Sequence, residues 1–161
     1  MSAARKPQQR SLPVLDDDPR GWDVRVAVAL LHFHSRLERC LSEGLSPYGV
    51  TLAQYDVLMT LCHGNGITQQ ELAERLLVTK ANVVGLIDRV SAAGWVERRP
   101  DPEDRRVNRL YLTDAGRKLA RAAQLGQYAL VKKIFGRLTE AELRQIHALI
   151  GRLDGACSEC D

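Results

Sequence analysis

The sequence predicts a mainly α-helical fold that carries one small β-hairpin. From residue 22 onward, apolar residues recur at three- and four-residue steps, which is the spacing of an amphipathic helix. Two short runs, 95–99 and 107–112, are instead expected as strands, because they flank a polar loop and the second places Leu110 and Leu112 on one face. We therefore expect helices over residues 23–45, 52–63, 69–76, 79–93, 114–136 and 140–153.

Threonines mark where most of these helices begin. Thr51, Thr68 and Thr139 each precede a Gln or Glu by three residues, which is the capping-box pattern. Thr79 and Thr113 are expected as simple N-caps, because a hydroxyl can accept from a free amide in the first helical turn. These signals set the start of every helix except the first.

The apolar stripes predict which side of each helix is buried. In helix 52–63 the stripe consists of Leu52, Tyr55, Leu58, Met59 and Cys62. In helix 79–93 it consists of Val83, Leu86, Ile87 and Val90. The last helix has a wide stripe for its length, made of Leu143, Ile146, Leu149, Ile150 and Leu153. That stripe either packs inside the chain or contacts a second copy.

Length and composition indicate a soluble globular protein with a short tail. The 161 residues are 45% hydrophobic and 27% charged, and no apolar run approaches the ~20 residues of a membrane span. No hydrophobic stretch follows the first ten residues, and four cysteines are too few for a disulfide scaffold, so we expect a cytoplasmic protein without membrane contact. Residues 1–20 contain three of the six prolines and are expected as a disordered tail.

The helix pair 69–76 and 79–93 has the spacing of a helix-turn-helix unit. In such a unit the second helix enters the DNA major groove with its N-terminal residues at the base edges. Those residues are Thr79, Lys80, Ala81 and Asn82. Thr and Asn form hydrogen bonds, Lys pairs with phosphate, and Ala leaves room or meets a thymine methyl group. A surface turn between two core helices is the alternative.

The hairpin loop strengthens the DNA-binding interpretation. Residues 97–106 carry four acids and four arginines, and Pro100 and Pro102 stiffen the loop by fixing φ. A stiff loop that presents arginine to the minor groove is what a winged helix needs, and we call hairpin 95–112 the wing. The whole net charge of +3 lies in residues 1–15, on Arg5, Lys6 and Arg10, and residues 16–161 sum to zero, so DNA binding rests on a few placed cations. A solvated, salt-bridged loop is the alternative.

The segment LVTKANVVGLIDRVSAAGWVERRPDPEDRRVNRLYLTDAG, residues 77–116, resembles the MarR family of bacterial transcription regulators. The resemblance implies a winged helix-turn-helix lobe over about 51–112 and dimerisation helices over about 22–46 and 114–154, within a domain of residues 21–161. It implies a homodimer on a palindromic double-stranded operator, with Arg106 oriented by Asp104 toward the minor groove. The expected DNA-binding residues are Thr68, Gln69, Thr79, Lys80, Ala81, Asn82, Asp104, Arg105 and Arg106.

The resemblance also implies a repressor that an aromatic or phenolic small molecule releases from DNA. Urate-responsive members use a Trp, an Asp and an Arg, to which Trp22, Asp56 and Arg89 correspond in this sequence. The alternative is that Trp22 packs at the helix start and that Asp56 and Arg89 form a structural ion pair. His32 and His34 lie two residues apart on one helix and therefore point in different directions.

A redox- or metal-responsive regulator is the competing hypothesis. Cys157 and Cys160 have CxxC spacing, which can lower a thiol pKa or contribute to a metal site. Incidental cysteines at a frayed terminus are the simpler interpretation, and Cys40 and Cys62 lie on apolar stripes. We expect no cofactor, no metal site and no catalytic residue, since no P-loop, zinc-hydrolase or nucleophile-elbow motif occurs. A pure protein-interaction module remains a further alternative.

Overall fold

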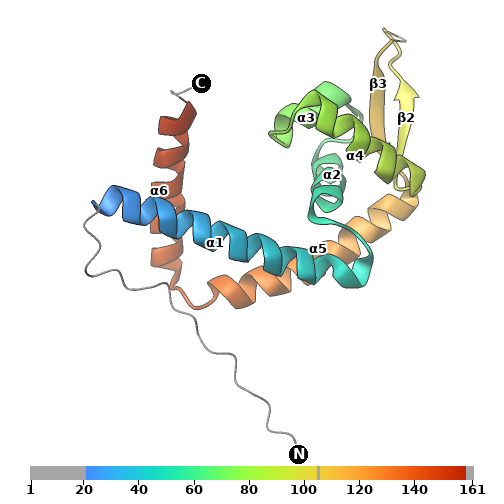
Figure 1. The fold of residues 1–161 in the computed structure, drawn as a ribbon. Coiled ribbons are helices and arrows are strands. Elements are labelled where there is room, and N and C mark those ends of the chain that lie inside the picture. The colour runs from blue at the N-terminus through green and yellow to red at the C-terminus, as the bar shows by residue number, and fades with distance from the viewer. Residues whose placement is uncertain (1–20, 105, 159–161) are drawn as a thin grey trace, which may run out of the picture. The chain divides into compact units, whose positions relative to one another are not determined.

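The computed structural model describes residues 21–104 and 106–158, so the expected tail 1–20 and Cys160 lie outside the described residues. Its elements follow in chain order: α1 (Trp22–Leu45), the 3-10 helix η1 (Ser46–Tyr48), α2 (Leu52–His63), β1 (Ile67–Thr68), α3 (Gln69–Arg75), α4 (Lys80–Ala92), β2 (Val96–Pro100), β3 (Asn108–Leu112), α5 (Asp114–Phe135) and α6 (Glu140–Ser158) (Figure 1). The predicted fold class is confirmed. The main difference in length is α6, which continues to Ser158.

The chain forms two compact units whose boundary falls inside α1. The first unit ends at Cys40, and the second runs from Leu41 onward and contains every other element. In the first unit, the Arg25 guanidinium stacks over the Trp22 ring at 4.1 Å from its centroid. Among the described residues, no helix is both long enough and apolar enough to cross a membrane.

The predicted helix caps are present. Thr51 and Thr68 form complete capping boxes with Gln54 and Glu71. At Thr139, the backbone amide donates to the Glu142 carboxylate over 2.7 Å, and the Glu142 amide donates back to the hydroxyl over 3.3 Å. These side chains satisfy amides that have no partner within the helix, which is why the sequence located the helix starts so closely.

The α4 helix ends in a Schellman motif built around Gly94. This glycine has φ +72°, and its amide donates to the Ser91 carbonyl over 2.9 Å. The Trp95 amide donates to the Val90 carbonyl over 3.0 Å, which completes the motif. The chain therefore reverses sharply after α4 and enters β2 directly.

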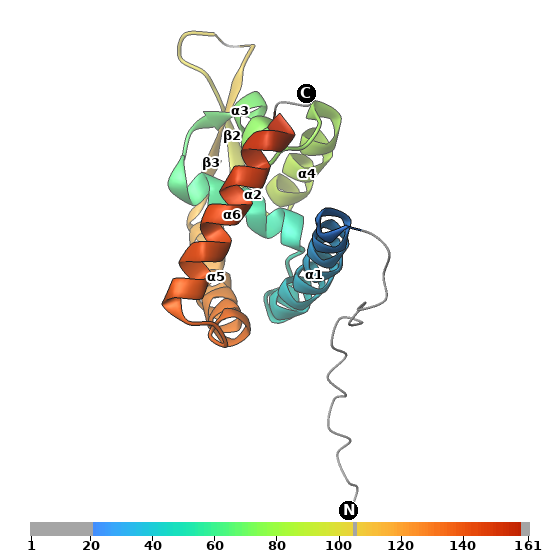
Figure 2. The ribbon, with the colours of Figure 1, turned by 90° about the vertical axis from the view of Figure 1, so that its left-hand side faces the viewer.

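The sheet has three antiparallel strands in the order β1-β3-β2. The β2 and β3 strands are the two predicted from the sequence, and Val96 pairs with Leu112 at the base of the hairpin. Both views show this hairpin projecting beyond α3 and α4 (Figures 1 and 2). The third strand, β1, was not predicted, because its two residues give no periodic pattern and its pairing of Ile67 with Leu110 joins distant parts of the chain.

The largest buried cluster joins α2, α3 and α4 to the sheet and to the start of α5. The predicted α4 stripe is confirmed, since all of its members are buried. The predicted α2 stripe is partly wrong: Val57, Leu58 and Leu61 form the buried side, whereas Cys62 is exposed. Apolar residues lie around most of the α2 surface and several elements pack against it, so periodicity could not select one buried side.

The apolar stripe of α6 is not buried inside the described chain. The exposed fractions are 38% for Ile146, 46% for Leu149, 49% for Ile150 and 50% for Leu153, and no α6 residue is buried. In α1 only Leu45 is buried. Within the second unit, which contains α6, the stripe is therefore left uncovered.

Candidate nucleic-acid interface

The turn between α3 and α4 fixes how the second helix is presented. The Val78 amide donates to the Ala73 carbonyl over 3.1 Å, and the Thr79 hydroxyl accepts from the Asn82 amide over 3.3 Å. Between them, Leu77 has φ +52°, an uncommon conformation for a leucine, and its side chain is 93% exposed. Leu72 and Ala73 of α3 belong to the same buried cluster as the inner side of α4, which holds the two helices together.

The outer side of α4 carries the residues predicted to approach DNA. Thr79, Ala81 and Asn82 are exposed at its N-terminus, and the Lys80 side chain lies outside the described part of the structure. Farther along the same helix, the Asp88 carboxylate accepts from the Arg98 guanidinium of β2. This ion pair connects α4 to the wing and neutralises a carboxylate on the exposed side of α4.

Asp101 organises the hairpin loop. One carboxylate oxygen accepts from the amides of Glu103 and Asp104 over 2.8 and 3.2 Å, and the other accepts from the Arg109 side chain. The Asp101 residue is only 6% exposed. The two backbone amides, followed by Arg109, hold the pKa of this carboxyl below its ordinary value of 3.8. The loop conformation is therefore determined by a buried carboxylate as well as by the prolines.

Arg109 extends this arrangement to the rest of the lobe. Its guanidinium also donates to the Gly66 carbonyl, just before β1, over 3.0 Å. It favours the charged forms of both Asp101 and Glu71. Arg109 thus joins the hairpin loop to the segment that leads into α3.

The roles of Asp101 and Arg109 were not predicted from the sequence. An aspartate before proline at the start of a loop was a signal for Asp101, since such side chains often accept from amides two or three residues later. No local pattern marked Arg109, because its partners lie 8 and 43 residues away in the chain.

Asp104, which is predicted to orient Arg106, contacts it through the backbone amide. The Asp104 carboxylate accepts from the Arg106 amide over 2.9 Å. A short aspartate side chain readily reaches the amide two residues later, whereas a bidentate contact would require Arg106 to fold back over its own turn. The Arg106 side chain is exposed, and Arg105 lies outside the described residues.

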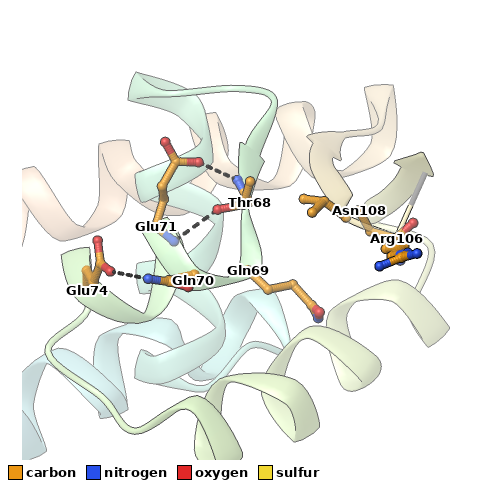
Figure 3. A pocket seen from close by; sticks show the side chains of 8 residues that line it. Thr68, Gln69, Gln70, Glu71, Glu74, Arg106 and Asn108 are labelled. Carbon is orange, nitrogen blue, oxygen red and sulfur yellow. Dashed lines mark hydrogen bonds between the residues drawn. The ribbon is translucent and has the colours of Figure 1, made fainter. Parts of the chain in front are cut away.

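A pocket of ≈ 480 Å³ separates the start of α3 from the hairpin. Figure 3 shows Thr68, Gln69 and Glu71 on the α3 side, with Arg106 and Asn108 on the hairpin side. The Thr68 amide donates to the Glu71 carboxylate over 2.7 Å, and this bond, together with the Thr68 hydroxyl, lowers the Glu71 pKa below 4.5. The pocket therefore brings together three predicted DNA-binding residues: Thr68 and Gln69 at the start of α3, and Arg106 of the wing.

The three predicted effector residues are not joined to one another by any described contact. Asp56 in α2 is half-buried, and this burial raises the pKa of its carboxyl above 3.8. Arg89 in α4 is exposed, and among the described residues no ion pair joins it to Asp56. Trp22 in the first unit is 73% exposed, so it is not packed at the helix start.

The thiols show no assembled metal or redox centre within the described chain. Cys40, Cys62 and Cys157 are free and exposed, and Cys160 cannot be compared because it lies outside the described residues. Burial raises the pKa of the Cys62 thiol, and the nearby Arg117 and Arg121 oppose that shift. No group of three or more metal-ligating side chains occurs among residues that the structure describes.

The match to a known protein family falls on the region that contains the helix-turn-helix and the hairpin. The model of the MarR family matches residues 48–107. The HTH-type transcriptional regulator PrsX of Escherichia coli is 30% identical over 131 residues, covering 78% of this chain and 79% of that protein. The multiple antibiotic resistance protein MarR of Escherichia coli K12 is 32% identical over 126 residues, covering 77% of this chain and 88% of that protein.

Two solved structures share the fold. A mutant MarR from Escherichia coli complexed with operator DNA superposes with a TM-score of 0.75 at 30% identity, covering 81% of this chain and 95% of that chain. CouR from Rhodococcus jostii, bound to p-coumaroyl-CoA, superposes with a TM-score of 0.74 at 23% identity, covering 83% and 94%. The second similarity concerns the fold alone.

Proposed function

Because this chain belongs to the MarR family of winged-helix transcriptional regulators, we propose that it binds a palindromic operator as a homodimer and represses transcription until an aromatic or phenolic effector releases it. The observation that carries the proposal is the pairing of two DNA-directed features on one lobe. These are the exposed N-terminus of α4 and the exposed Arg106 in a loop fixed by Asp101. The MarR structure with operator DNA supports the assignment by similarity.

We assign the two DNA grooves to different elements. Thr79, Lys80, Ala81 and Asn82 approach base edges in the major groove, as the second helix of a helix-turn-helix does. Asp104, Arg105 and Arg106 lie at the minor groove, where arginine senses groove width and negative potential. Thr68 and Gln69 at the start of α3 contact the phosphate backbone, which sets register without reading sequence.

The homodimer is proposed from the uncovered apolar stripe of α6. Ile146, Leu149, Ile150 and Leu153 are left exposed within the second unit, and contiguous apolar surface of this kind marks contact with a partner. We place the dimerisation helices at about 22–46 and 114–154. A two-fold dimer would place its two α4 helices ~34 Å apart, which is one turn of DNA. Such a dimer would therefore read a palindrome.

Asp56 and Arg89 of the second unit are proposed as effector-binding residues, and Trp22 of the first unit as a further one. The half-buried Asp56 has a raised pKa and no ion pair with Arg89, so a ligand that supplies a hydrogen-bond donor would relieve an unfavourable carboxylate. The exposed Trp22 offers an aromatic face.

Selection of duplexes from random-sequence DNA by the purified full chain tests this proposal. The expected product is a palindromic family of sequences whose half-site centres lie one helical turn apart. Repeating the selection with a panel of aromatic acids should reduce the recovery of those duplexes. Failure to enrich any duplex would overturn the proposed function.

A further inference from the structure

The exposed side of α4 is unusually apolar for a surface that faces DNA. Val83, Ile87 and Val90 define the buried side, and steps of about 100° per residue place Ala81 and Gly85 on the opposite side. Val84 lies beside them and is 45% exposed. A Cβ atom added to Gly85 would meet nothing within 4 Å, so this part of the helix is open to a close neighbour.

Among the described side chains on this side of α4, the charged Asp88 is already paired. The Asp88 carboxylate accepts from Arg98, which engages the Arg98 guanidinium at the C-terminal end of the apolar segment. Guanine is most often read by a bidentate Arg or Lys that donates to O6 and N7. Among the described side chains from Ala81 to Val84, only Asn82 is polar and exposed. None of these described side chains offers guanine the bidentate donor pair of an Arg or a Lys.

The major groove offers one apolar group to such a surface, the C5 methyl of thymine. Contact between that methyl and an exposed valine removes apolar area of both from water. Gly85 and Ala81 have little or no side chain, so the helix backbone can approach closely enough for Val84 to reach a base edge. Resting on the proposed function, we infer that Val84, with Ala81 and Gly85 beside it, reads thymine methyl groups, so that each operator half-site has thymine opposite α4.

Replacing thymine by uracil tests the inference, because it removes only the methyl group. The probe is the tightest-binding duplex from the random-sequence selection, resynthesised with deoxyuridine in place of thymidine inside the half-sites. Wild-type protein should bind this duplex roughly fourfold more weakly for each contacted methyl group. A duplex with deoxyuridine only in the flanking sequence should bind as the original does.

Protein variants connect this loss to Val84. In V84A, the affinity ratio between the thymidine and deoxyuridine duplexes should fall toward one, and V84T, which keeps one methyl group, should be intermediate. Leu125 is an exposed apolar residue on α5, at 72% exposed, so L125A is the matched control. The ratio compares two duplexes bound by the same protein, so any effect of L125A on the dimer cancels and the wild-type ratio should be kept. Circular dichroism of each variant checks that the fold is retained.

The outcomes separate this inference from the function on which it rests. Equal binding of both duplexes by wild-type protein, or an unchanged ratio in V84A, overturns thymine reading and leaves operator binding intact. Failure to bind any selected duplex overturns the proposed function and this inference together. Thymine reading is supported if the affinity ratio between the thymidine and deoxyuridine duplexes falls in V84A but not in L125A.

Discussion

Asp101 and Arg109 form an ion pair at the loop end of the hairpin, and Arg109 also donates to the Gly66 carbonyl over 3.0 Å. The same Asp101 carboxylate accepts from two amides of the loop. One buried acid and one arginine therefore connect the tip of the wing to the segment that enters α3. Because Arg106 stands on this loop, its position depends on residues that need not touch DNA.

Removing the Asp101 carboxylate should weaken DNA binding while the core stays folded. D101A loses both amide contacts and the ion pair, so we expect on the order of tenfold weaker operator binding, the effect of losing one well-placed contact. D101N keeps an oxygen that can accept from the amides and should bind with intermediate affinity. Fluorescence anisotropy with a labelled duplex measures the operator affinities of wild type, D101N and D101A. Equal affinity of D101A and wild type would show that the loop does not need Asp101.

Gly116 is required at the start of α5, because the chain passes very close to it there. A Cβ at this position would lie 2.0 Å from the Trp95 carbonyl oxygen, which also accepts from Thr113. G116A should therefore lower the free energy of unfolding by roughly 3 kcal/mol, as overpacking against backbone does. Urea denaturation measures this change. A variant as stable as wild type would mean that the contact relaxes without cost.

Gly85 provides the matched control, since its Cβ would meet nothing. G85A should raise the free energy of unfolding by about 0.5–1 kcal/mol, because alanine suits a helix interior better than glycine. The same variant should bind operator DNA more weakly if the helix approaches the groove closely at this point. Increased stability with unchanged affinity would argue against that close approach.

Burial of Asp56 predicts a pH-dependent cost to stability. Because its pKa is raised in the folded state, the charged carboxylate destabilises the fold once the pH exceeds the ordinary value of 3.8, and the cost is complete above the folded pKa. D56N should thus be more stable than wild type at pH 7, and this difference should vanish near pH 3. Denaturation curves across that range measure it. A constant difference at all pH values would rule out titration of Asp56 as the cause.

The α6 stripe predicts a charge-sensitive dimer. I150E places a carboxylate within the exposed apolar stripe, and we expect it to dissociate the dimer and to weaken operator binding by at least tenfold. A148E adds the same charge on the side of the helix opposite the stripe, about half a turn from Ile150, and should leave the dimer intact. Sedimentation velocity distinguishes the two species. A dimer that persists in I150E would place the interface elsewhere.

Local signals explain why the helices could be predicted. The threonine caps act within three residues, and the α4 stripe repeats within one element, so both are visible in the sequence alone. The α2 stripe failed because apolar residues lie around most of that helix, and only its neighbours decide which of them are buried.

The candidate site was only partly predictable, since its support is non-local. Arg106 and the N-terminus of α4 could be found from spacing and chemistry. The ion pairs of Arg109 with Asp101 and of Arg98 with Asp88 depend on strand pairing and helix packing, which bring together residues eight and ten positions apart. The short strand β1, which aligns Thr68 with Arg109, left no local pattern at all.

The most direct measurement of the central claim is the salt dependence of operator binding by R106A. If Arg106 contacts DNA in the minor groove, the variant should bind about tenfold or more weakly, and the slope of log affinity against log salt should fall by about one. R144A removes an exposed arginine on α6 and should keep the wild-type affinity and slope. Wild-type affinity and an unchanged slope in R106A would contradict the assignment of the wing to DNA.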